Sequence, residues 1–391
     1  MSIVVSGIGI VSALGIGLKE NLKTIRRMKG GISPTPSILE TDIELPVGEI
    51  LLTDGQLHDI AGIRRDRHLS RTALLGIIAV KEALTDAGIG TTRKIGLVSS
   101  TSVGGMDRTE LFYRQFTKEE TSGRLRDVIM HDCAASTAAI TEHCGINSYS
   151  TTISTACSSA ANAVIAGARL LRHGIVDCVA VGGCDALTAF TLNGFNSLMI
   201  LDKVPCRPFD NRHAGLNLGE GAGFLILQLK ESVSSYYCEL AGYANRNDAY
   251  HQTATSDNGT GAYLAMAKAL EMAGILPDDI EYINAHGTGT VNNDNSESRA
   301  MLKIFGNSLP PFSSTKSLTG HTLAAAGGIE AALTAVAVKE GYLYPNLNFE
   351  TPVPEFNISP IHEFRSGYKI KYAMSNSFGF GGNCTSLIFS R

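Results

Sequence analysis

Short runs of β-branched and other apolar residues alternate along the chain with longer, alanine-rich runs. Runs short enough for strands occupy residues 2–5, 95–99, 150–154, 179–181 and 224–229. Apolar residues recur at three- and four-residue spacing, as in helices, over residues 71–87, 158–171, 263–273 and 324–340. This alternation predicts a layered α/β fold, because helices that follow strands can cover the faces of a sheet.

Two short patterns each occur twice. The segments ALTDAGI (residues 83–89) and ALEMAGI (residues 269–275) each end a predicted helix and precede a predicted strand, at residues 95–99 and 280–284. The glycine in each segment suits a left-handed helix end. Likewise GEGAG (residues 219–223) precedes the strand at 224–229, and GFGG (residues 379–382) precedes a strand at 387–389. These repeats predict two related halves, residues 1–230 and 231–391.

Size and charge narrow the function. The chain has 391 residues, with 33 Lys+Arg against 37 Asp+Glu and a net charge of −4. This balance excludes a dominant basic surface for nucleic acid, and the length allows a large core without disulfides or metal ions. Only 18% of residues are charged and 41 are glycine, which favours close backbone packing and a buried subunit interface.

Targeting signals are not evident in the sequence. The sequence contains no run of ~18 apolar residues, so no membrane-spanning helix is expected. The N-terminus, MSIVVSGIGIVSALG, has no basic segment typical of a signal peptide and predicts a strand and turn. The eight cysteines form no C-x-x-C pair, which favours reduced thiols and a cytoplasmic protein.

The sharpest candidate for chemistry is Cys157, in the segment STACSSAANA (residues 154–163). A predicted strand ends just before it and a helix of small residues begins at or just after it. Unpaired N–H groups and the positive end of the helix dipole favour a thiolate there, hence a nucleophile. The alternative is an ordinary buried cysteine.

Two histidines lie in glycine- and threonine-rich turns. His286 follows a predicted strand in NAHGTGT, and His321 precedes a helix in KSLTGHTLAAAG. Such turns are where open α/β folds place reactive groups. Zinc bound by Cys157 and both histidines is an alternative, but the sequence has no closely spaced pair of metal ligands.

Other segments could complete a site. The N–H groups of GFGG (residues 379–382) could form half of an oxyanion hole, since this loop leads into a strand and does not fit a dinucleotide-binding motif. Lys316 could pair with Glu330 if both are buried. Arg64, Arg65 and Arg67 form a basic cluster that could dock an acidic partner.

Taken together, and in this order, these segments resemble the β-ketoacyl-acyl-carrier-protein synthases of the thiolase superfamily, closest to the elongating type II enzymes. The family pattern is T-A-C-S/T-S, then H-G-T-x-T, then K-S-x-x-G-H-x-x-A-A-A-G, then F-G-F-G-G. This chain has all four, at Cys157, at residues 286–290, at residues 316–327 and at residues 378–382. The resemblance implies a five-layered αβαβα fold built from two duplicated halves, and a homodimer.

The resemblance also implies roles for single residues. Cys157 would accept the acyl group, while His286 and His321 would donate hydrogen bonds to the malonyl thioester carbonyl. Lys316 would support His321 and balance the charge of the site. The N–H groups of Cys157 and Phe380 would form the oxyanion hole. The remaining expected groups are Phe380 as a gate of the acyl pocket, Thr288 and Thr290 as contacts of the pantetheine arm, Phe378 as a substrate contact, and Arg64, Arg65 and Arg67 as the docking site for the carrier.

The implied reaction is the decarboxylative condensation of a carrier-bound acyl group with malonyl-acyl carrier protein. It requires no cofactor and no metal. The expected partners are therefore acyl carrier protein and its acyl and malonyl thioesters, with no nucleic acid and no insertion into a membrane.

The chain departs from the family pattern at three places. Asn383 and Cys384 follow GFGG where Thr-Asn is usual, RHAG (residues 212–215) stands near the usual R-D-G-F, and Val291 replaces a proline. None removes a group named above, but each affects the pocket. We therefore expect a specialised synthase of secondary-metabolite, aryl-polyene or polyketide-like assembly as an alternative to ordinary fatty-acid synthesis.

Three competing hypotheses remain open on the sequence. A non-condensing chain-length-type partner subunit of a synthase heterodimer would typically lack the reactive cysteine. A coenzyme A-dependent thiolase or a ketoacyl synthase III would use its cysteine with other partners than two histidines. A metal-dependent hydrolase would require bound zinc.

Overall fold

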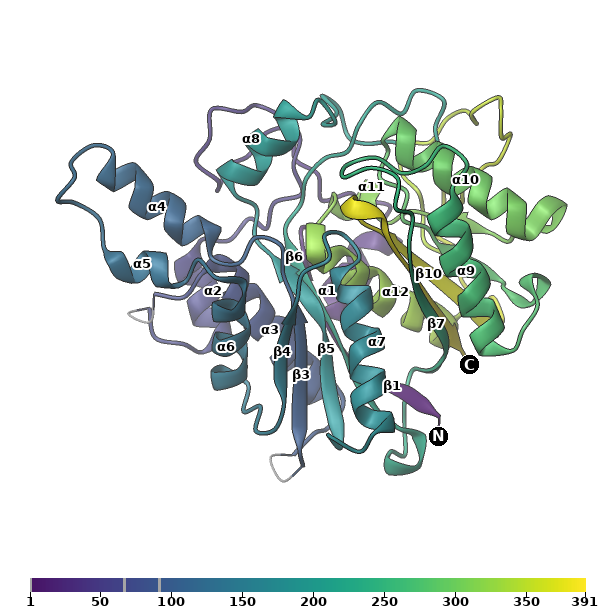
Figure 1. Cartoon of the computed structure of the whole chain (residues 1–391), viewed down its shortest axis with the longest axis horizontal. Coiled ribbons are helices and arrows are strands. Elements are labelled where there is room, and N and C mark those ends of the chain that lie inside the picture. The colour runs from purple at the N-terminus through teal and green to yellow at the C-terminus, as the bar shows by residue number, and fades with distance from the viewer. Residues whose placement is uncertain (1, 66–67, 91–92) are drawn as a thin grey trace.

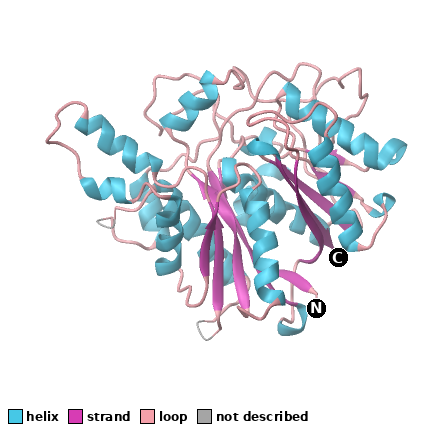
Figure 2. Cartoon of the chain, in the orientation of Figure 1, coloured by secondary structure: helices cyan, strands magenta, loops and turns pink. Residues whose placement is uncertain are grey.

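The computed structural model describes residues 2–65, 68–90 and 93–391, in which helices and strands alternate as predicted (Figure 2). The strands are β1 (Ile3–Ser12), β2 (Gly15–Ile16), β3 (Ile95–Ser100), β4 (Ser150–Ile153), β5 (Cys178–Asp185), β6 (Gly221–Leu229), β7 (Cys238–Asn247), β8 (Tyr282–Asn284), β9 (Phe312–Ser313), β10 (Tyr372–Phe378) and β11 (Asn383–Ser390). The α-helices are α1 (Leu18–Arg26), α2 (Asp54–Ala61), α3 (Arg71–Asp86), α4 (Met106–Phe116), α5 (Leu125–Ile129), α6 (Cys133–His143), α7 (Ser159–Arg172), α8 (Ala189–Ser197), α9 (Thr260–Ala273), α10 (Val291–Phe305), α11 (Lys316–Thr319) and α12 (Ala326–Glu340). Short 3₁₀ helices include η4 (Leu323–Ala325) and η5 (Phe380–Gly382).

The described strands form one continuous sheet in the order β4-β3-β5-β6-β1-β7-β11-β10-β8-β9, with β2 paired to β1. At its centre, β1 and β7 are joined by only two residue pairs, Val4–Glu239 and Val5–Cys238. On either side of this junction the pairing is extensive. The sheet therefore consists of an N-terminal half and a C-terminal half.

The two halves have the same topology. Outward from the centre, the strands are β1, β6, β5, β3, β4 in one half and β7, β11, β10, β8, β9 in the other. In both, the first three strands pair antiparallel and the outer pairs are parallel. Helices also correspond, because α3 and α9 follow the first strands and α7 and α12 come before β5 and β10. The duplication predicted from the sequence repeats is confirmed.

The halves stack as five layers (Figure 1). Helix α3 covers the outer face of the N-terminal half, and α9, backed by α10, covers the outer face of the C-terminal half. Helices α7 and α12 pack against each other and against strands of the sheet halves, forming the middle layer. Helix α12 is buried at almost every position, so it shows no amphipathic pattern, as expected of a helix enclosed on all sides.

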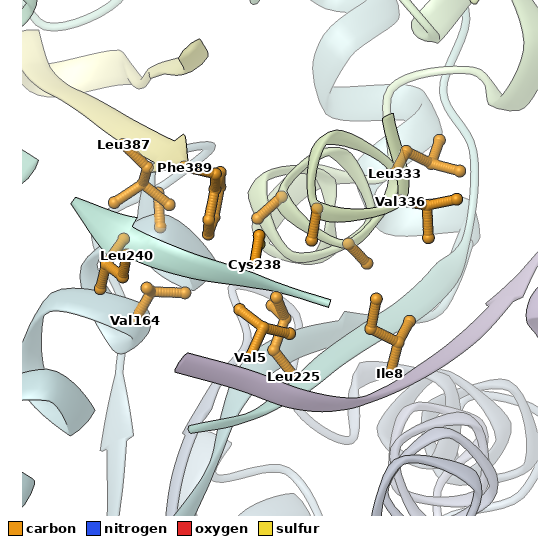
Figure 3. Close-up of a cluster of buried hydrophobic side chains, with 14 of the residues drawn as sticks. Val5, Ile8, Val164, Leu225, Cys238, Leu240, Leu333, Val336, Leu387 and Phe389 are labelled. Atoms are coloured by element: carbon orange, nitrogen blue, oxygen red, sulfur yellow. The ribbon is translucent and has the colours of Figure 1, made fainter. Parts of the chain in front are cut away.

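The central core joins both halves. Figure 3 shows Leu333 and Val336 of α12 in one cluster with Val5 of β1, Cys238 of β7 and Phe389 of β11. All are buried, with at most 1% of their surface exposed. Removing this apolar surface from water stabilises the assembly of the two halves by roughly 25 cal/mol per Å².

In both halves, the helix that ends in the repeated segment packs closely against a central strand. Gly7 of β1 lies against α3, where a Cβ would come within 2.3 Å of the Ala83 carbonyl oxygen. Gly242 of β7 lies against α9, where a Cβ would come within 2.4 Å of the Ala269 carbonyl oxygen. Small residues at these positions therefore allow each helix to approach its strand closely. Beyond these helices, Gly88 and Gly274 adopt the predicted left-handed conformation, with φ of 61° and 66°.

Some sequence predictions were too short or incomplete. Strand β1 runs to Ser12 and not to residue 5, because the interior glycines that α3 requires obscure the strand pattern. Gly221–Gly223 begin β6 and do not precede it. The sequence pattern did not identify β7, β10, α4, α6 or α10. Within the described part of the chain, we find no helix that is both long and apolar enough to span a membrane.

Candidate active site

A tight turn between β4 and α7 presents Cys157 at the head of the helix. Ala156, just before it, has a φ of 52°, an uncommon value for a residue with a side chain. The Ser159 hydroxyl stabilises this turn by accepting from the Thr155 N–H at 2.7 Å and donating to the Ala156 carbonyl. The sequence prediction of a cysteine at the start of a helix is confirmed.

Two histidines from the C-terminal half meet Cys157. His321 Nε2 lies 3.0 Å from Cys157 Sγ, and the rings of His286 and His321 contact edge to face with centroids 5.6 Å apart. The backbone N–H groups of Cys157 and Phe380 lie close enough to this sulfur to lower the pKa of its thiol. Residues far apart in the sequence therefore surround one buried atom.

The protonation of Cys157 differs from the sequence prediction. Burial raises the pKa of the thiol to about 11, although the Lys316 charge and the two backbone N–H groups act in the opposite direction. The N–H groups favour the thiolate, as expected, but desolvation outweighs them, so the resting thiol is protonated.

His321 is held in one tautomer. Its Nδ1 accepts a hydrogen bond from the Leu323 N–H at 3.2 Å, and burial together with Lys316 lowers its pKa well below the usual value. A neutral ring with an accepting Nδ1 carries its proton on Nε2. His321 therefore donates from Nε2 toward the Cys157 sulfur.

His286 has the same tautomer for a different reason. The Lys316 ammonium lies 3.2 Å from His286 Nδ1 and donates to the His286 carbonyl at 2.6 Å. Burial lowers the pKa of His286 well below the usual value, with further contributions from Lys316 and His321. Because an ammonium only donates, Nδ1 accepts and the ring proton lies on Nε2.

Lys316 is buried and contacts His286, not His321 as the resemblance implied. It also forms the expected ion pair with Glu330 of α12. Burial raises the pKa of Glu330 to about 7, an effect that the neighbouring Lys316 charge opposes. The pair places a positive charge behind the histidines and so keeps both rings neutral.

These groups lie at one pocket of about 420 Å³. Of the predicted residues it is lined by Cys157, His286, His321, Thr288, Thr290, Phe378 and Phe380. The Thr288 and Thr290 hydroxyls are 2.9 Å apart. Phe380 stacks on Phe195 of α8, with ring centroids 5.9 Å apart. Most of the lining is apolar, and Cys157, His286 and His321 bring reactive groups to it, as in a pocket for a largely apolar ligand.

Of the predicted carrier-docking residues, Arg64 and Arg65 do not line this pocket. Arg65 is exposed and pairs with Asp59, with its Nε 3.1 Å from an Asp59 oxygen. Arg64 is also exposed. Arg67 lies outside the described residues.

The chemistry of Cys157, His286 and His321 bears on the alternative that these residues bind zinc. The possible ligand atoms of Cys157, His286 and His321 lie within 4.8 Å of one another. However, the Lys316 ammonium lies directly behind His286 and opposes a second positive charge, and both rings present N–H groups toward the sulfur side of the pocket. The arrangement suits hydrogen-bond donation better than metal binding.

Sequence reasoning missed several residues that support the site. Glu297 of α10 accepts from the N–H groups of His286 and Gly287, at 2.9 and 2.8 Å. Asp185, at the end of β5, accepts from the Ala324 N–H at 2.8 Å and so holds the loop after His321. A helical start after Thr290, with acidic residues on its inner side, was the available signal for Glu297. Asp185 and Phe195 had no local signal.

The sequence of the chain matches known proteins over its whole length. Models of the N-terminal and C-terminal domains of β-ketoacyl synthases match residues 1–232 and 237–350. The 3-oxoacyl-[acyl-carrier-protein] synthase 2 of Staphylococcus aureus is 31% identical over 409 residues, covering 100% of this chain and 98% of the relative. The protein of the same name from Synechocystis sp. is 31% identical over 414 residues with the same coverage. The chain belongs to the β-ketoacyl synthase family and is an acyltransferase of that kind.

Solved structures agree with this assignment. The ishigamide ketosynthase/chain length factor superposes with a TM-score of 0.93 at 25% identity, covering 100% of this chain and 98% of that one. The ketosynthase ApeO in complex with its chain length factor ApeC, from Xenorhabdus doucetiae, gives 0.86 at 30% identity, covering 100% and 98%. The predicted thiolase-like five-layered fold is confirmed.

Proposed function

We propose that this chain joins an acyl group held on Cys157 to the two-carbon unit of malonyl-acyl carrier protein, releasing carbon dioxide and a β-ketoacyl carrier. One observation carries the proposal. The backbone N–H groups of Cys157 and Phe380 lie near the Cys157 sulfur, and the neutral rings of His286 and His321 line the same pocket. Acyl transfer to Cys157 requires the two backbone N–H groups, which stabilise the oxyanion. Enolate formation requires the two histidine N–H groups.

In the first step, the Cys157 sulfur attacks the acyl thioester carbonyl of the loaded carrier. The N–H groups of Cys157 and Phe380 bind the oxygen of the tetrahedral intermediate. This intermediate expels the carrier thiolate, which takes the proton given up by Cys157. The acyl group is then a thioester of Cys157.

In the second step, the C–C bond to the malonyl carboxylate breaks and its electron pair forms an enolate. The Nε2–H groups of His286 and His321 donate to the enolate oxygen as its charge develops. The enolate carbon attacks the acyl thioester, and the intermediate expels Cys157 as a thiolate, which takes up one proton from water. No step draws on a cofactor or a metal.

Further residues serve binding. Lys316 holds the tautomer of His286 and opposes its protonation. Phe380, stacked on Phe195, gates the acyl end of the pocket, and Phe378 contacts the substrate. Thr288 and Thr290 contact the pantetheine arm. Arg64, Arg65 and Arg67 supply positive charge for docking acyl carrier protein.

The setting of the enzyme is also a proposal. We place it in the cytoplasm as a homodimer, with residues 1–230 and 231–391 as its two units. The departures at Asn383, Cys384 and Val291 favour specialised, polyene- or polyketide-like assembly over ordinary fatty-acid synthesis. Similarity to a type II PKS ketosynthase solved with its acyl-carrier protein, with a TM-score of 0.88 at 28% identity, supports this choice. A preference for long saturated acyl carriers would contradict it.

The alternative of a non-condensing partner subunit accounts less well for the site. Such a subunit needs neither a nucleophile nor paired enolate donors. Here Cys157, His286 and His321 are retained and assembled in one pocket.

The direct test is acyl loading. Intact-mass spectrometry after incubation with a panel of acyl carriers should show one added acyl group on the native chain. Cys157→Ala should remove this adduct and abolish condensation, while Cys133→Ala, a half-buried cysteine of α6, should leave both unchanged. Normal condensation by Cys157→Ala would refute the proposal.

A further inference from the structure

A network of amides and hydroxyls lies directly behind the turn that carries Cys157. At its centre, Asn383 Oδ1 lies 2.8 Å from the Ser158 hydroxyl, 2.8 Å from the Asn162 amide nitrogen and 2.6 Å from the Asn245 amide nitrogen. These three donors belong to the head of α7 and to β7. One side-chain oxygen of the C-terminal half therefore binds the nucleophile turn of the N-terminal half.

The network is closed around Asn162. Its Oδ1 accepts from the Thr385 hydroxyl at 2.9 Å, and its Nδ2 donates to the Thr155 hydroxyl at 2.9 Å. The Ser158 hydroxyl, which has one proton, also lies 2.8 Å from the Thr155 carbonyl and shares its proton between the two acceptors. The turn from Thr155 to Ser158 is thus held by side chains of β11 and α7 at several points, which restricts its position more than one bond would.

The backbone of Asn383 holds the opposite side of the site. Its carbonyl accepts from the Gly379 N–H at 2.9 Å and so closes the loop that presents the Phe380 N–H. The two loops touch, since a Cβ on Gly379 would lie 3.2 Å from the Cys157 nitrogen. Asn383 therefore contacts the residue after Cys157 through its side chain and the residue before Phe380 through its backbone.

We propose that Asn383 is the positioning residue of the oxyanion hole, fixing the spacing between the N–H groups of Cys157 and Phe380. This inference rests on the proposed function. Backbone donors stabilise an oxyanion only when both reach the same oxygen, and small displacements reduce the rate. Asn383 does not touch substrate, so its effect acts through the two loops it joins.

The proposal distinguishes two half-reactions. Acyl transfer to Cys157 passes through a tetrahedral intermediate and needs the oxyanion hole, whereas decarboxylation of the malonyl carrier needs the donors of His286 and His321. Asn383→Ala should therefore slow acyl loading about 10-fold, in kcat more than in KM. In a Cys157→Ala background, where decarboxylation is measured alone, adding Asn383→Ala should change its rate by less than about 2-fold.

Three further variants distinguish a specific effect of Asn383 from a general loss of folding or activity. Asn383→Ser, a milder change, should show the same selective loss if the Ala variant folds poorly. Asn162→Ala, which removes a partner in the network, should slow loading without adding fully to Asn383→Ala. Asn147→Ala is the matched control, because Asn147 also bridges backbone groups, of Arg93 and Ile95, but at the opposite end of β4 from Cys157.

The outcomes separate this inference from the proposed function. If the native chain never loads an acyl group, the proposed function fails. If the native chain loads and both Asn383 variants load at the native rate, only the role of Asn383 is refuted. Equal loss of loading and decarboxylation would also refute it, since that result indicates a general disturbance of the site.

Discussion

At the scale of single residues, the chemistry depends on protonation states that burial sets. Cys157 is a resting thiol, and both histidines are neutral, because desolvation disfavours every charged form in this pocket. The buried cation beside them, Lys316, is paired with Glu330. As the proposed nucleophile, Cys157 would therefore ionise during attack and not before it.

This state predicts the pH dependence of Cys157 alkylation. With a pKa of about 11, the thiolate fraction rises about tenfold for each pH unit up to pH 10, whereas an ordinary cysteine with a pKa of ~8.5 levels off near pH 9. The rate of iodoacetamide modification at Cys157, measured by peptide mass spectrometry between pH 7 and 10, should follow the steeper curve. A plateau below pH 8 would show a thiolate stabilised by the helix and contradict this account.

At the scale of elements, close contact between strand and helix shapes both halves. Gly7 and Gly242 occupy equivalent places, each facing a carbonyl oxygen of the helix that covers its strand. Adding a methyl group there forces the helix away from the sheet, and overpacking of this kind costs about 1–3 kcal/mol.

Gly7→Ala should therefore lower the melting temperature by several degrees, and Gly242→Ala should do the same. Gly194→Ala in α8 is the control, because nothing lies within 4 Å of the place that its new methyl group would occupy and alanine favours a helix. Calorimetry of the three variants provides the comparison. An unchanged melting temperature for Gly7→Ala would mean that the contact relaxes without cost.

At the scale of the whole molecule, the region formed by α4, α5 and the edge strand β4 is only partly covered by the rest of the described chain. Helices α4 and α5 project from the body of the chain (Figure 1), and α4 has no buried residue. Leu125 is 76% exposed and Ile129 73% exposed on α5. Strand β4 is at the edge of the sheet, paired with β3 alone among the described strands. Exposed apolar surface and an open strand edge, both in the N-terminal half, favour association with a second subunit.

We expect the purified chain to sediment as a dimer, at twice 41.5 kDa. The double variant Leu125→Glu/Ile129→Glu should weaken the dimer, because each charge would be buried without a partner. Leu276→Glu changes a residue that is 71% exposed, remote from α5 in the C-terminal half, and should leave the dimer intact. A native chain that is monomeric alone but associates with a related subunit would instead indicate a heterodimer.

The sequence by itself determined the α/β class, the internal repeat and some of the residues that line the pocket, such as Cys157, His286 and His321, because helix periodicity, helix-end glycines and reactive motifs are local features. It could not determine that Lys316 contacts His286, that burial keeps Cys157 protonated, or that Asn383 binds Ser158 from the other half of the chain. These properties depend on distances and desolvation created when the two halves pack around α7 and α12. Only the tertiary structure decides them, since no local pattern encodes which groups lose contact with water together.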